Sequence, residues 1–375
     1  MVTLQSQDRR QGLFTFDAVN GQYHAWLLAE DKRFDRSVWL PDGSGVLAAY
    51  RTNLHDDGGQ IGFVSYPKGE FHSITNDTNN YAGLSLSADG KALVTVLNNV
   101  NHRVSVPPSD GSGQGTDLTS RQTSWGAVWT ADGKLLLDLD YAIVTIDPAA
   151  GEKTVLRAHD GSVFASGPSI CADGKTVVLT AGAFTQNIYR MDLNGSNFKR
   201  LTSGKNDISP VCSPDSRFVY YFDYGDTAHG SRIPIDGGAS EPISKFLDWG
   251  GGFDLSADGT LLAYAGLLKP APDYKVGRVV ENLESGQPVE LFDSDITSGP
   301  NVICFTRDAK ALFLVKHQSG GDSLWLQSLD KSAAKQLATF KSDQIWDIHL
   351  SPDGKKLAMV RHSTDSDVVL LQTQP

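Results

Sequence analysis

The 375-residue sequence has few cysteines and no long apolar run, and each shortage excludes a class of protein. Cys171, Cys212 and Cys304 show no CxxC spacing, so neither a zinc site nor a redox pair is indicated. We expect all three to be buried apolar residues in strands. No stretch approaches the roughly 20 apolar residues of a membrane helix, and the first ten residues lack the apolar region of a signal peptide. Direct membrane insertion is therefore not expected.

The sequence also has few positively charged residues. The 33 lysines and arginines are outnumbered by 44 aspartates and glutamates, which gives a net charge of −11. Such a chain repels phosphate backbones, so nucleic acid is not an expected partner. The sequence contains no Gly-rich phosphate loop, HRD, DFG or GxSxG motif. We therefore expect no cofactor, and we predict that this domain is not an enzyme.

What the sequence does contain is one short turn, typically Ser-Pro-Asp-Gly or a close variant, that recurs eight times. Its aspartates are 41 to 50 residues apart, a period typical of propeller blades. The residues three before and four after each aspartate are apolar, as in two strands joined by a turn. We expect a structural role for the aspartates, which can bind backbone amides in the turn. They are Asp42, Asp89, Asp132, Asp173, Asp215, Asp258, Asp308 and Asp353.

Each hairpin is followed by a third and a fourth strand pattern, as at residues 187–192 and 198–202. Four strands make one blade, and blades bury their faces by stacking in a closed ring. The sequence therefore predicts an all-β fold, an eight-bladed β-propeller of four-stranded antiparallel blades that forms one domain over residues 1–375. The last repeat ends after its third strand, so we expect the N-terminal segment 23–27 to complete it. Segment 13–17 is then surplus.

The stretch from Ile188 to Tyr221, which begins IYRMDLNGSNFKRLT and ends SPVCSPDSRFVYY, resembles the TolB-like (WD-like) propeller repeats of bacterial envelope proteins. Segments 340–346 and 367–370 are similar to the C-terminal propeller of bacterial membrane-anchored serine/threonine kinases. This resemblance implies an extracytoplasmic sensor domain, periplasmic or at the cell surface. Any kinase activity would lie outside these residues.

The loops that enter each first strand are expected to surround the mouth of the central channel, and six of them carry an aromatic residue. Aromatic rings there can contact peptides or stack on sugars, although each ring could equally wedge between blades. We predict a monomeric binding domain whose ligand is a protein, peptide or glycan. The candidate ligand-binding residues are Phe34, Tyr81, Trp125, Phe164, Trp249 and Trp346, with Arg36, His159 and Asp207 in equivalent loops.

Two other functions remain open. A metal-assisted polysaccharide lyase or hydrolase would need at least three His, Asp or Glu side chains to converge in the channel. The nine histidines form no HxH or HExxH pair, but distant ones can meet in a ring. Acidic pairs such as Asp138 and Asp140 lack a calcium loop, and we expect them to face solvent. A scaffold that binds through its outer edges is the third possibility.

Overall fold

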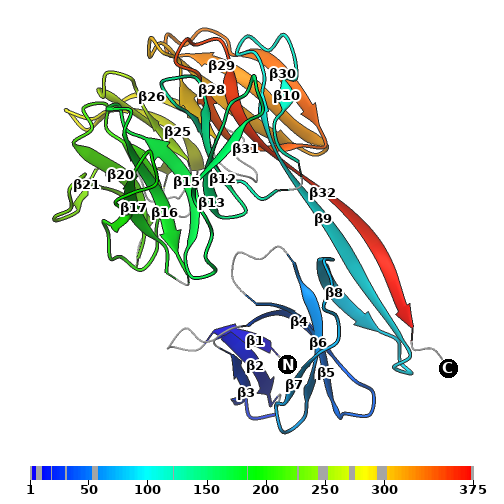
Figure 1. Ribbon diagram of the computed structural model, residues 1–375. Helices are drawn as coiled ribbons and strands as arrows, with labels where there is room; N and C mark the ends of the chain where they lie inside the picture. Colours follow the sequence, from blue (N-terminus) through cyan, green and yellow to red (C-terminus); the bar gives the residue numbers. More distant parts are fainter. Residues whose placement is uncertain are drawn as a thin grey trace. The chain divides into compact units, whose positions relative to one another are not determined.

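The computed structural model consists of strands and connecting loops, with no helix among the described residues (Figure 1). It describes residues 2–5, 11–17, 19–29, 32–52, 58–120, 122–183, 185–225, 228–243, 252–269, 275–293 and 302–372. These residues form eight antiparallel sheets, most of them four-stranded, which confirms the all-β fold class. The number of sheets equals the number of predicted repeats, but the turns of Asp89 and Asp353 belong to one sheet, and the sheet β1-β2-β3 contains no repeat turn. The chain divides into two compact units, Met1–Val100 with Thr364–Pro375, and Asn101–Ser363. We call them unit 1 and unit 2.

Unit 1 contains a three-stranded sheet and a four-stranded sheet. Leu13 and Phe34 come from different sheets and lie in one apolar core with Val46 and Val64. The strands are β1 (Val2–Gln5), β2 (Gln11–Phe16), β3 (Tyr23–Ala29), β4 (Arg33–Trp39), β5 (Gly45–Arg51), β6 (Gln60–Ser65), β7 (Phe71–Ser73) and β8 (Tyr81–Leu86), which pairs with the start of β9 (Ala92–Val106).

Unit 2 contains five sheets that follow one another along the chain, each built from four consecutive strands. They are β11 (Ala127–Trp129), β12 (Leu135–Leu139), β13 (Ala142–Ile146) and β14 (Lys153–Arg157); β15 (Phe164–Ile170), β16 (Thr176–Gly182), β17 (Asn187–Asp192) and β18 (Lys199–Arg200); β19 (Asp207–Cys212), β20 (Phe218–Tyr224), β21 (Ala228–Pro234) and β22 (Glu241–Pro242); β23 (Phe253–Leu255), β24 (Leu261–Lys269), β25 (Lys275–Asn282) and β26 (Gln287–Asp293); and β27 (Ile303–Phe305), β28 (Ala311–Gln318), β29 (Gly321–Ser328) and β30 (Lys335–Lys341).

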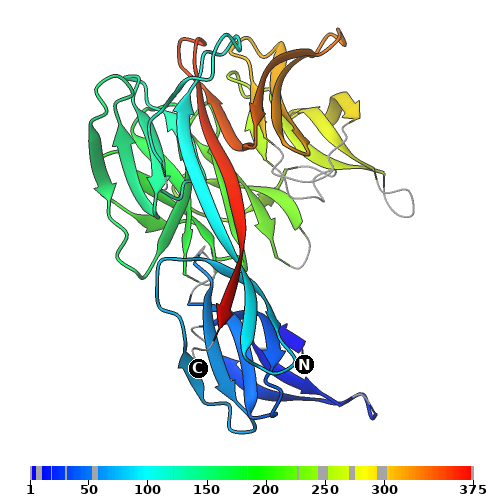
Figure 2. The ribbon, with the colours of Figure 1, turned by 90° about the vertical axis from the view of Figure 1, so that its right-hand side faces the viewer.

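A sixth sheet closes the ring of unit 2. It combines β31 (Gln344–Leu350) and β32 (Leu357–Gln372) with β9 and β10 (Thr116–Asp117), in the order β10-β9-β32-β31. Figures 1 and 2 show the cyan β9 beside the red β32. Apolar side chains of this sheet pack on both neighbours: Met359 on the sheet of Phe313, and Val360 on the sheet of Leu137. Each remaining pair of adjacent sheets also shares an apolar cluster, so six sheets form a closed propeller ring.

The strand that completes the last repeat differs from the prediction. Segment 23–27 lies in β3 and pairs with β2, whereas the last sheet is completed by β9 and β10. The predicted closing segment was wrong because two segments, 23–27 and 101–106, have suitable strand patterns, and alternation of side chains does not specify the pairing partner.

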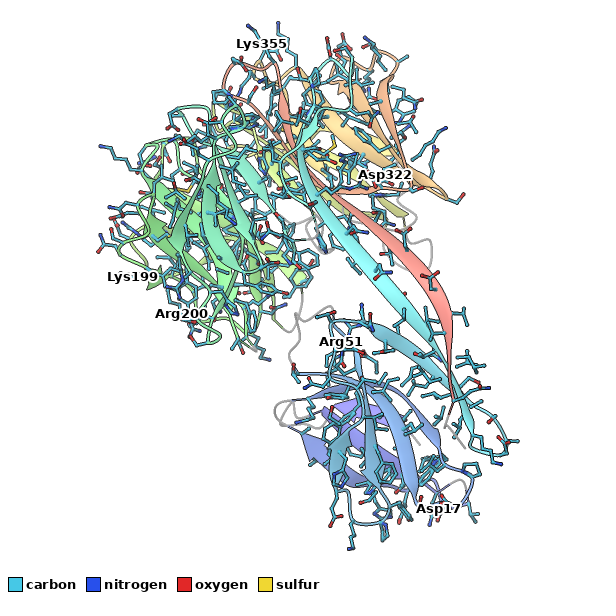
Figure 3. The ribbon with its side chains drawn as sticks, turned by 45° about the vertical axis from the view of Figure 1, so that its right-hand side comes forward. Asp17, Arg51, Lys199, Arg200, Asp322 and Lys355 are labelled. Carbon is cyan, nitrogen blue, oxygen red and sulfur yellow. A yellow bond between two sulfur atoms is a disulfide. The ribbon has the colours of Figure 1, made fainter. Side chains whose placement is uncertain are left out.

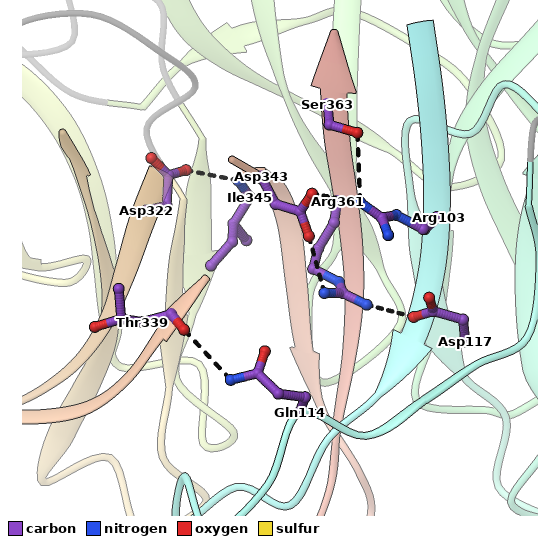
Figure 4. Close-up of polar contacts among 9 residues, drawn as sticks. All are labelled: Arg103, Gln114, Asp117, Asp322, Thr339, Asp343, Ile345, Arg361 and Ser363. Carbon is purple, nitrogen blue, oxygen red and sulfur yellow. Dashed lines mark hydrogen bonds and ion pairs between the residues drawn. The ribbon is translucent and has the colours of Figure 1, made fainter. Parts of the chain in front are cut away.

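Charged side chains join the strands of the closing sheet (Figure 4). The Arg361 guanidinium donates to Asp343 Oδ2 at 2.9 Å and also to Asp117, and Arg103 donates to the other oxygen of Asp343. The Arg361 and Asp343 side chains are only 8% and 7% exposed. Strands from opposite ends of unit 2 are therefore linked by an ionic network whose central pair, Arg361 and Asp343, is buried.

The repeated turn aspartates have the predicted structural role. In the turn of Asp258, the Ser256 hydroxyl and the Thr260 amide donate to one carboxylate oxygen, at 2.6 and 3.0 Å. These bonds hold the pKa of the Asp258 carboxyl at about 2, below its usual 3.8. Asp215 and Asp353 make the same bond to the serine two residues earlier.

Two of the three cysteines are not the simple apolar residues that we predicted. Cys171, which follows β15, forms a disulfide with Cys212 of β19, and their Cα atoms are 5.0 Å apart. Adjacent sheets bring these positions together because both cysteines stand just before a repeat turn. Cys304 is buried and free, as expected, and burial raises its thiol pKa well above the usual value.

No helix that could span a bilayer occurs among the described residues.

Candidate functional site

All six sheets of unit 2 line one cavity at the channel end where the innermost strands begin. This entry cavity has a volume of about 420 Å³, within the range of ligand pockets. Each sheet contributes to its wall, represented by Trp125, Pro168, Ile208, Phe253, Ile303 and Trp346. A second cavity of about 300 Å³ lies among the repeat turns at the other end, and Ser169, Val211 and His349 line both. The two cavities therefore belong to one channel.

Bulges in the innermost strands shape the entry cavity. The pairing register shifts between Ser166 and Ser169 of β15 and between Ile208 and Val211 of β19. In the second bulge Ser209 has a φ of 55°, a conformation in which a non-glycine residue is uncommon. In β31 a shift between residues 345 and 347 lets two consecutive residues, Trp346 and Asp347, both line the cavity.

Trp125 and Trp346, both predicted from the sequence, contact each other with ring centroids 5.1 Å apart. Two histidines that the sequence did not single out complete the group. The His102 ring lies 5.4 Å from Trp125 and stacks on His362 at 4.8 Å, and His362 lies 5.2 Å from Trp346. We call these four residues the aromatic group. It presents two indole rings to the entry cavity from the first and last sheets of the ring.

Buried carboxylates fix the segments that carry the two tryptophans. Asp138 of β12 accepts hydrogen bonds from the amides of Trp125 and Gly126 at 3.1 and 2.9 Å. Asp322 of β29 accepts one from the Ile345 amide at 2.6 Å, next to Trp346 (Figures 3 and 4). Asp138 is 1% exposed, so the expectation that it faces solvent was wrong. Its neighbours in β12 are leucines, and it is buried with them.

Asp138 makes a pH-dependent contribution to stability. Burial raises the pKa of its carboxyl from 3.8 to about 7, although the backbone amides partly oppose that shift. Between pH 3.8 and about 7, the folded state therefore retains a proton that the unfolded chain has lost. Stability from this group is full below pH 3.8 and declines as the pH rises through about 7.

Asp138→Asn should reduce this pH dependence. A neutral amide oxygen still accepts from Gly126 but has no charge to desolvate, so we expect a gain of about 1–2 kcal/mol at pH 8 and little change near pH 4. Urea unfolding at both pH values measures the difference. If the variant lost as much stability as wild type between these pH values, the pH dependence would not come from the Asp138 carboxyl. Asp330→Asn, in an exposed turn, is the matched control.

A polar cluster that the sequence analysis missed lies at the junction of the two cavities. His349 Nε2 is 3.4 Å from Asp347 Oδ1, and Asp347 Oδ2 accepts from the Ala127 amide at 3.2 Å. Asp254 accepts from the Phe305 amide at 2.7 Å, and burial raises its pKa. Burial opposes protonation of His349, but the two carboxylates outweigh it and raise the histidine pKa.

The remaining predicted residues of unit 2 lie away from the entry cavity. The Phe164 and His159 rings lie 4.9 Å apart, and both contact Tyr141. Asp207 is 1% exposed and accepts from the Gly204 amide and the Asn187 side chain, at 3.0 Å each. None of these side chains is among the described residues that line the cavity.

The predicted residues of unit 1 are mostly in its core. Phe34 is 2% exposed within the apolar core, and Tyr81 is buried with its hydroxyl donating to Asp77 at 2.8 Å. Their placement fits the alternative of rings wedged between sheets. Arg36 is exposed in β4. Trp249 lies outside the described residues.

A metal centre was the requirement of the lyase alternative. Within the described ranges, no three His, Cys, Asp or Glu side chains are placed to hold a metal ion.

Comparison with known proteins finds similarity at the level of structure. No family model and no curated protein matches the sequence. TolB from Acinetobacter baumannii has a TM-score of 0.52 and 15% identity, over 90% of this chain and 82% of TolB. A chain of the nidogen/laminin complex has a TM-score of 0.51 and 13% identity, over 72% of this chain and 98% of that one.

One prediction is corrected by these comparisons. A gluconolactonase from Xanthomonas campestris matches with 13% identity and a TM-score of 0.49, over 72% of this chain and 90% of that one. An oligogalacturonate lyase is also among the similar structures. The prediction that this domain is not an enzyme was wrong, because the missing kinase and GxSxG motifs exclude only two kinds of catalysis. At these identities the comparisons establish the fold alone, and this chain has the fold of TolB-like β-propellers.

Proposed function

We propose that this chain is an extracytoplasmic binding propeller that recognises a protein partner through the entry cavity. The observation that carries the proposal is the pair of contacting indoles, Trp125 and Trp346, on the wall of a cavity lined by all six sheets. Rigid aromatic side chains supply large contact area at low entropic cost, and they dominate many protein interfaces. The anchoring carboxylates Asp138 and Asp322 hold the backbone beside both rings before a partner arrives.

A protein or peptide suits this cavity better than a glycan. Among the described residues, its wall combines five aromatic side chains, from Trp125, Phe222, Tyr224, Phe253 and Trp346, with one carboxylate and one imidazole. That mixture is typical of the centre of a protein interface. The nidogen/laminin structure, a protein complex, has a similar propeller.

The disulfide supports an extracytoplasmic location, since such bonds persist in oxidising compartments. The resemblance of segments 340–346 and 367–370 to kinase sensor propellers supports a finer assignment. On that assignment the chain is the ectodomain of a receptor-type serine/threonine kinase and binds its ligand as a monomer.

Selection from a random peptide display library tests the proposal. Wild type should enrich peptides that bind at least about tenfold more weakly to a Trp125→Ala, Trp346→Ala double variant, because truncating interface tryptophans commonly costs about 2 kcal/mol or more. The control is Trp39→Ala, which removes a tryptophan of unit 1 that is 39% exposed. Circular dichroism verifies that each variant is folded.

Two outcomes would contradict the proposal. One is enrichment that the double variant retains in full, which would favour recognition by the outer edges of the propeller. The other is that the selection returns no peptide whose binding depends on the two tryptophans, while the protein binds selectively to an oligosaccharide array. That result would favour a glycan ligand.

A further inference from the structure

The charge of the entry cavity indicates what kind of group it accepts. We propose that it binds a cationic side chain, the ammonium of lysine or the guanidinium of arginine, with Trp125 and Trp346 as aromatic walls and Asp347 as the counter-charge. This inference rests on the proposed binding function and specifies its ligand.

The walls and the carboxylate are placed by one local feature. The bulge in β31 turns Trp346 and Asp347 toward the same cavity, although neighbours in a regular strand point to opposite faces. Trp125 reaches the same wall from the neighbouring sheet, with its ring centroid 5.1 Å from that of Trp346. A Cβ atom added at Gly126, the residue after Trp125, would lie 3.4 Å from Asp347 Oδ2. The Asp347 carboxylate therefore lies beside the backbone that follows Trp125, and it lines the same cavity as both tryptophans.

Both features attract cations. The face of an indole ring carries the negative part of its quadrupole, and tryptophan is the strongest aromatic partner for ammonium and guanidinium groups. Asp347 is the one carboxylate among the described residues that line the entry cavity, and they include no lysine or arginine. The chain as a whole carries a net charge of −11, which favours the approach of basic partners.

His349 decides how much of the Asp347 charge a ligand meets. The groups that face this imidazole are Asp347 on its own strand, Asp254 of β23, and Arg307 beyond β27, whose guanidinium donates to backbone carbonyls of Leu350 and Ser351. A protonated His349 neutralises Asp347 at 3.4 Å, whereas a neutral His349 leaves the carboxylate available. Binding of a cation should therefore tighten as the pH rises, and binding of an anion should weaken.

The test uses three peptides that differ in one side chain: acetyl-Gly-Lys-Gly-amide, its norleucine counterpart and its glutamate counterpart. Quenching of tryptophan fluorescence measures each affinity for wild type, Asp347→Asn and Asp330→Asn. The amide oxygen that replaces the Asp347 carboxylate can still accept from Ala127, so this substitution removes the charge with little change in structure. Asp330→Asn removes one charge from an exposed turn.

We expect the lysine peptide to bind at least about tenfold more tightly than the norleucine peptide, the scale of a desolvated cation–π contact. Asp347→Asn should abolish that preference, Asp330→Asn should retain it, and wild-type affinity should rise as the pH rises through the His349 pKa, which lies above 6.5. An equal or higher affinity for norleucine or glutamate would overturn the inference, as would a preference that Asp347→Asn retains.

Failure of this inference is distinct from failure of the proposed function. If display selection returns tryptophan-dependent peptides without basic residues, the cavity binds peptides but the cationic ligand is wrong. If no peptide binds in a tryptophan-dependent way, the proposed function fails, and this inference fails with it.

Discussion

Replacing Arg361 with methionine is expected to lower the free energy of unfolding of unit 2 by about 3–5 kcal/mol, the usual effect of removing one partner from a buried ion pair. The buried Asp343 carboxylate would lose its bond to Arg361 and keep its bond to Arg103. Asp117 would lose its partner in β32. The methionine fills much of the arginine volume beside Phe340, so lost packing contributes little.

The substitution should affect more than the contacts of Arg361 itself, because the closing sheet joins the two ends of unit 2. β9 and β10 come from the start of unit 2, and β31 and β32 come from its end, so Arg361 and Arg103 link strands that no short loop connects. β31 also carries Trp346 and Asp347. We therefore expect the same variant to bind peptide ligands more weakly.

Urea unfolding of Arg361→Met beside Lys355→Met measures the effect. Lys355 is an exposed cation in the turn before β32, labelled in Figure 3, and its replacement should cost less than about 0.5 kcal/mol. In a double variant with Asp343→Asn the two losses should not add, because the network is one unit. If Arg361→Met were as stable as Lys355→Met, a buried network at this sheet would be refuted.

The repeat turns could be predicted because their chemistry is local. Asp258 binds a hydroxyl two residues before it and an amide two residues after it, so the sequence contains the whole motif. The closing strand could not be predicted in this way. Strands β9 and β32 come from opposite ends of unit 2, and β3 offers a similar alternation of side chains. The choice between them depends on packing across the ring.

The candidate site was predicted in part for the same reason. Trp125 and Trp346 were found because they stand at one position of the repeat, seven residues before the turn aspartates Asp132 and Asp353. Asp347 was missed because regular alternation places it opposite Trp346, and only the bulge turns both inward. His102 and His362 were missed because they belong to the closing strands β9 and β32, whose partners the repeat pattern does not identify.

The disulfide between Cys171 and Cys212 is expected to contribute about as much to the free energy of unfolding as Arg361 does. Its removal by a Cys171→Ala, Cys212→Ala double substitution is expected to lower the free energy of unfolding by about 4 kcal/mol in the chain-entropy view. The bond spans 41 residues, one full repeat. Its removal therefore raises the conformational entropy of the unfolded chain. Both sulfur atoms lie in an apolar cluster with Val178 and Val219, where alanine leaves a small cavity.

Thermal unfolding with and without a reducing agent measures this contribution. Wild type should lose stability when reduced, whereas the double variant should be unaffected, and Cys304→Ala should respond to reduction as wild type does because that thiol is free. Sheets β15–β18 and β19–β22 are adjacent in the ring, so the bond also restrains the bulged strands β15 and β19. Reduction should therefore weaken peptide binding before it unfolds the protein. Identical melting of wild type under both conditions would mean that the two sulfurs are not bonded.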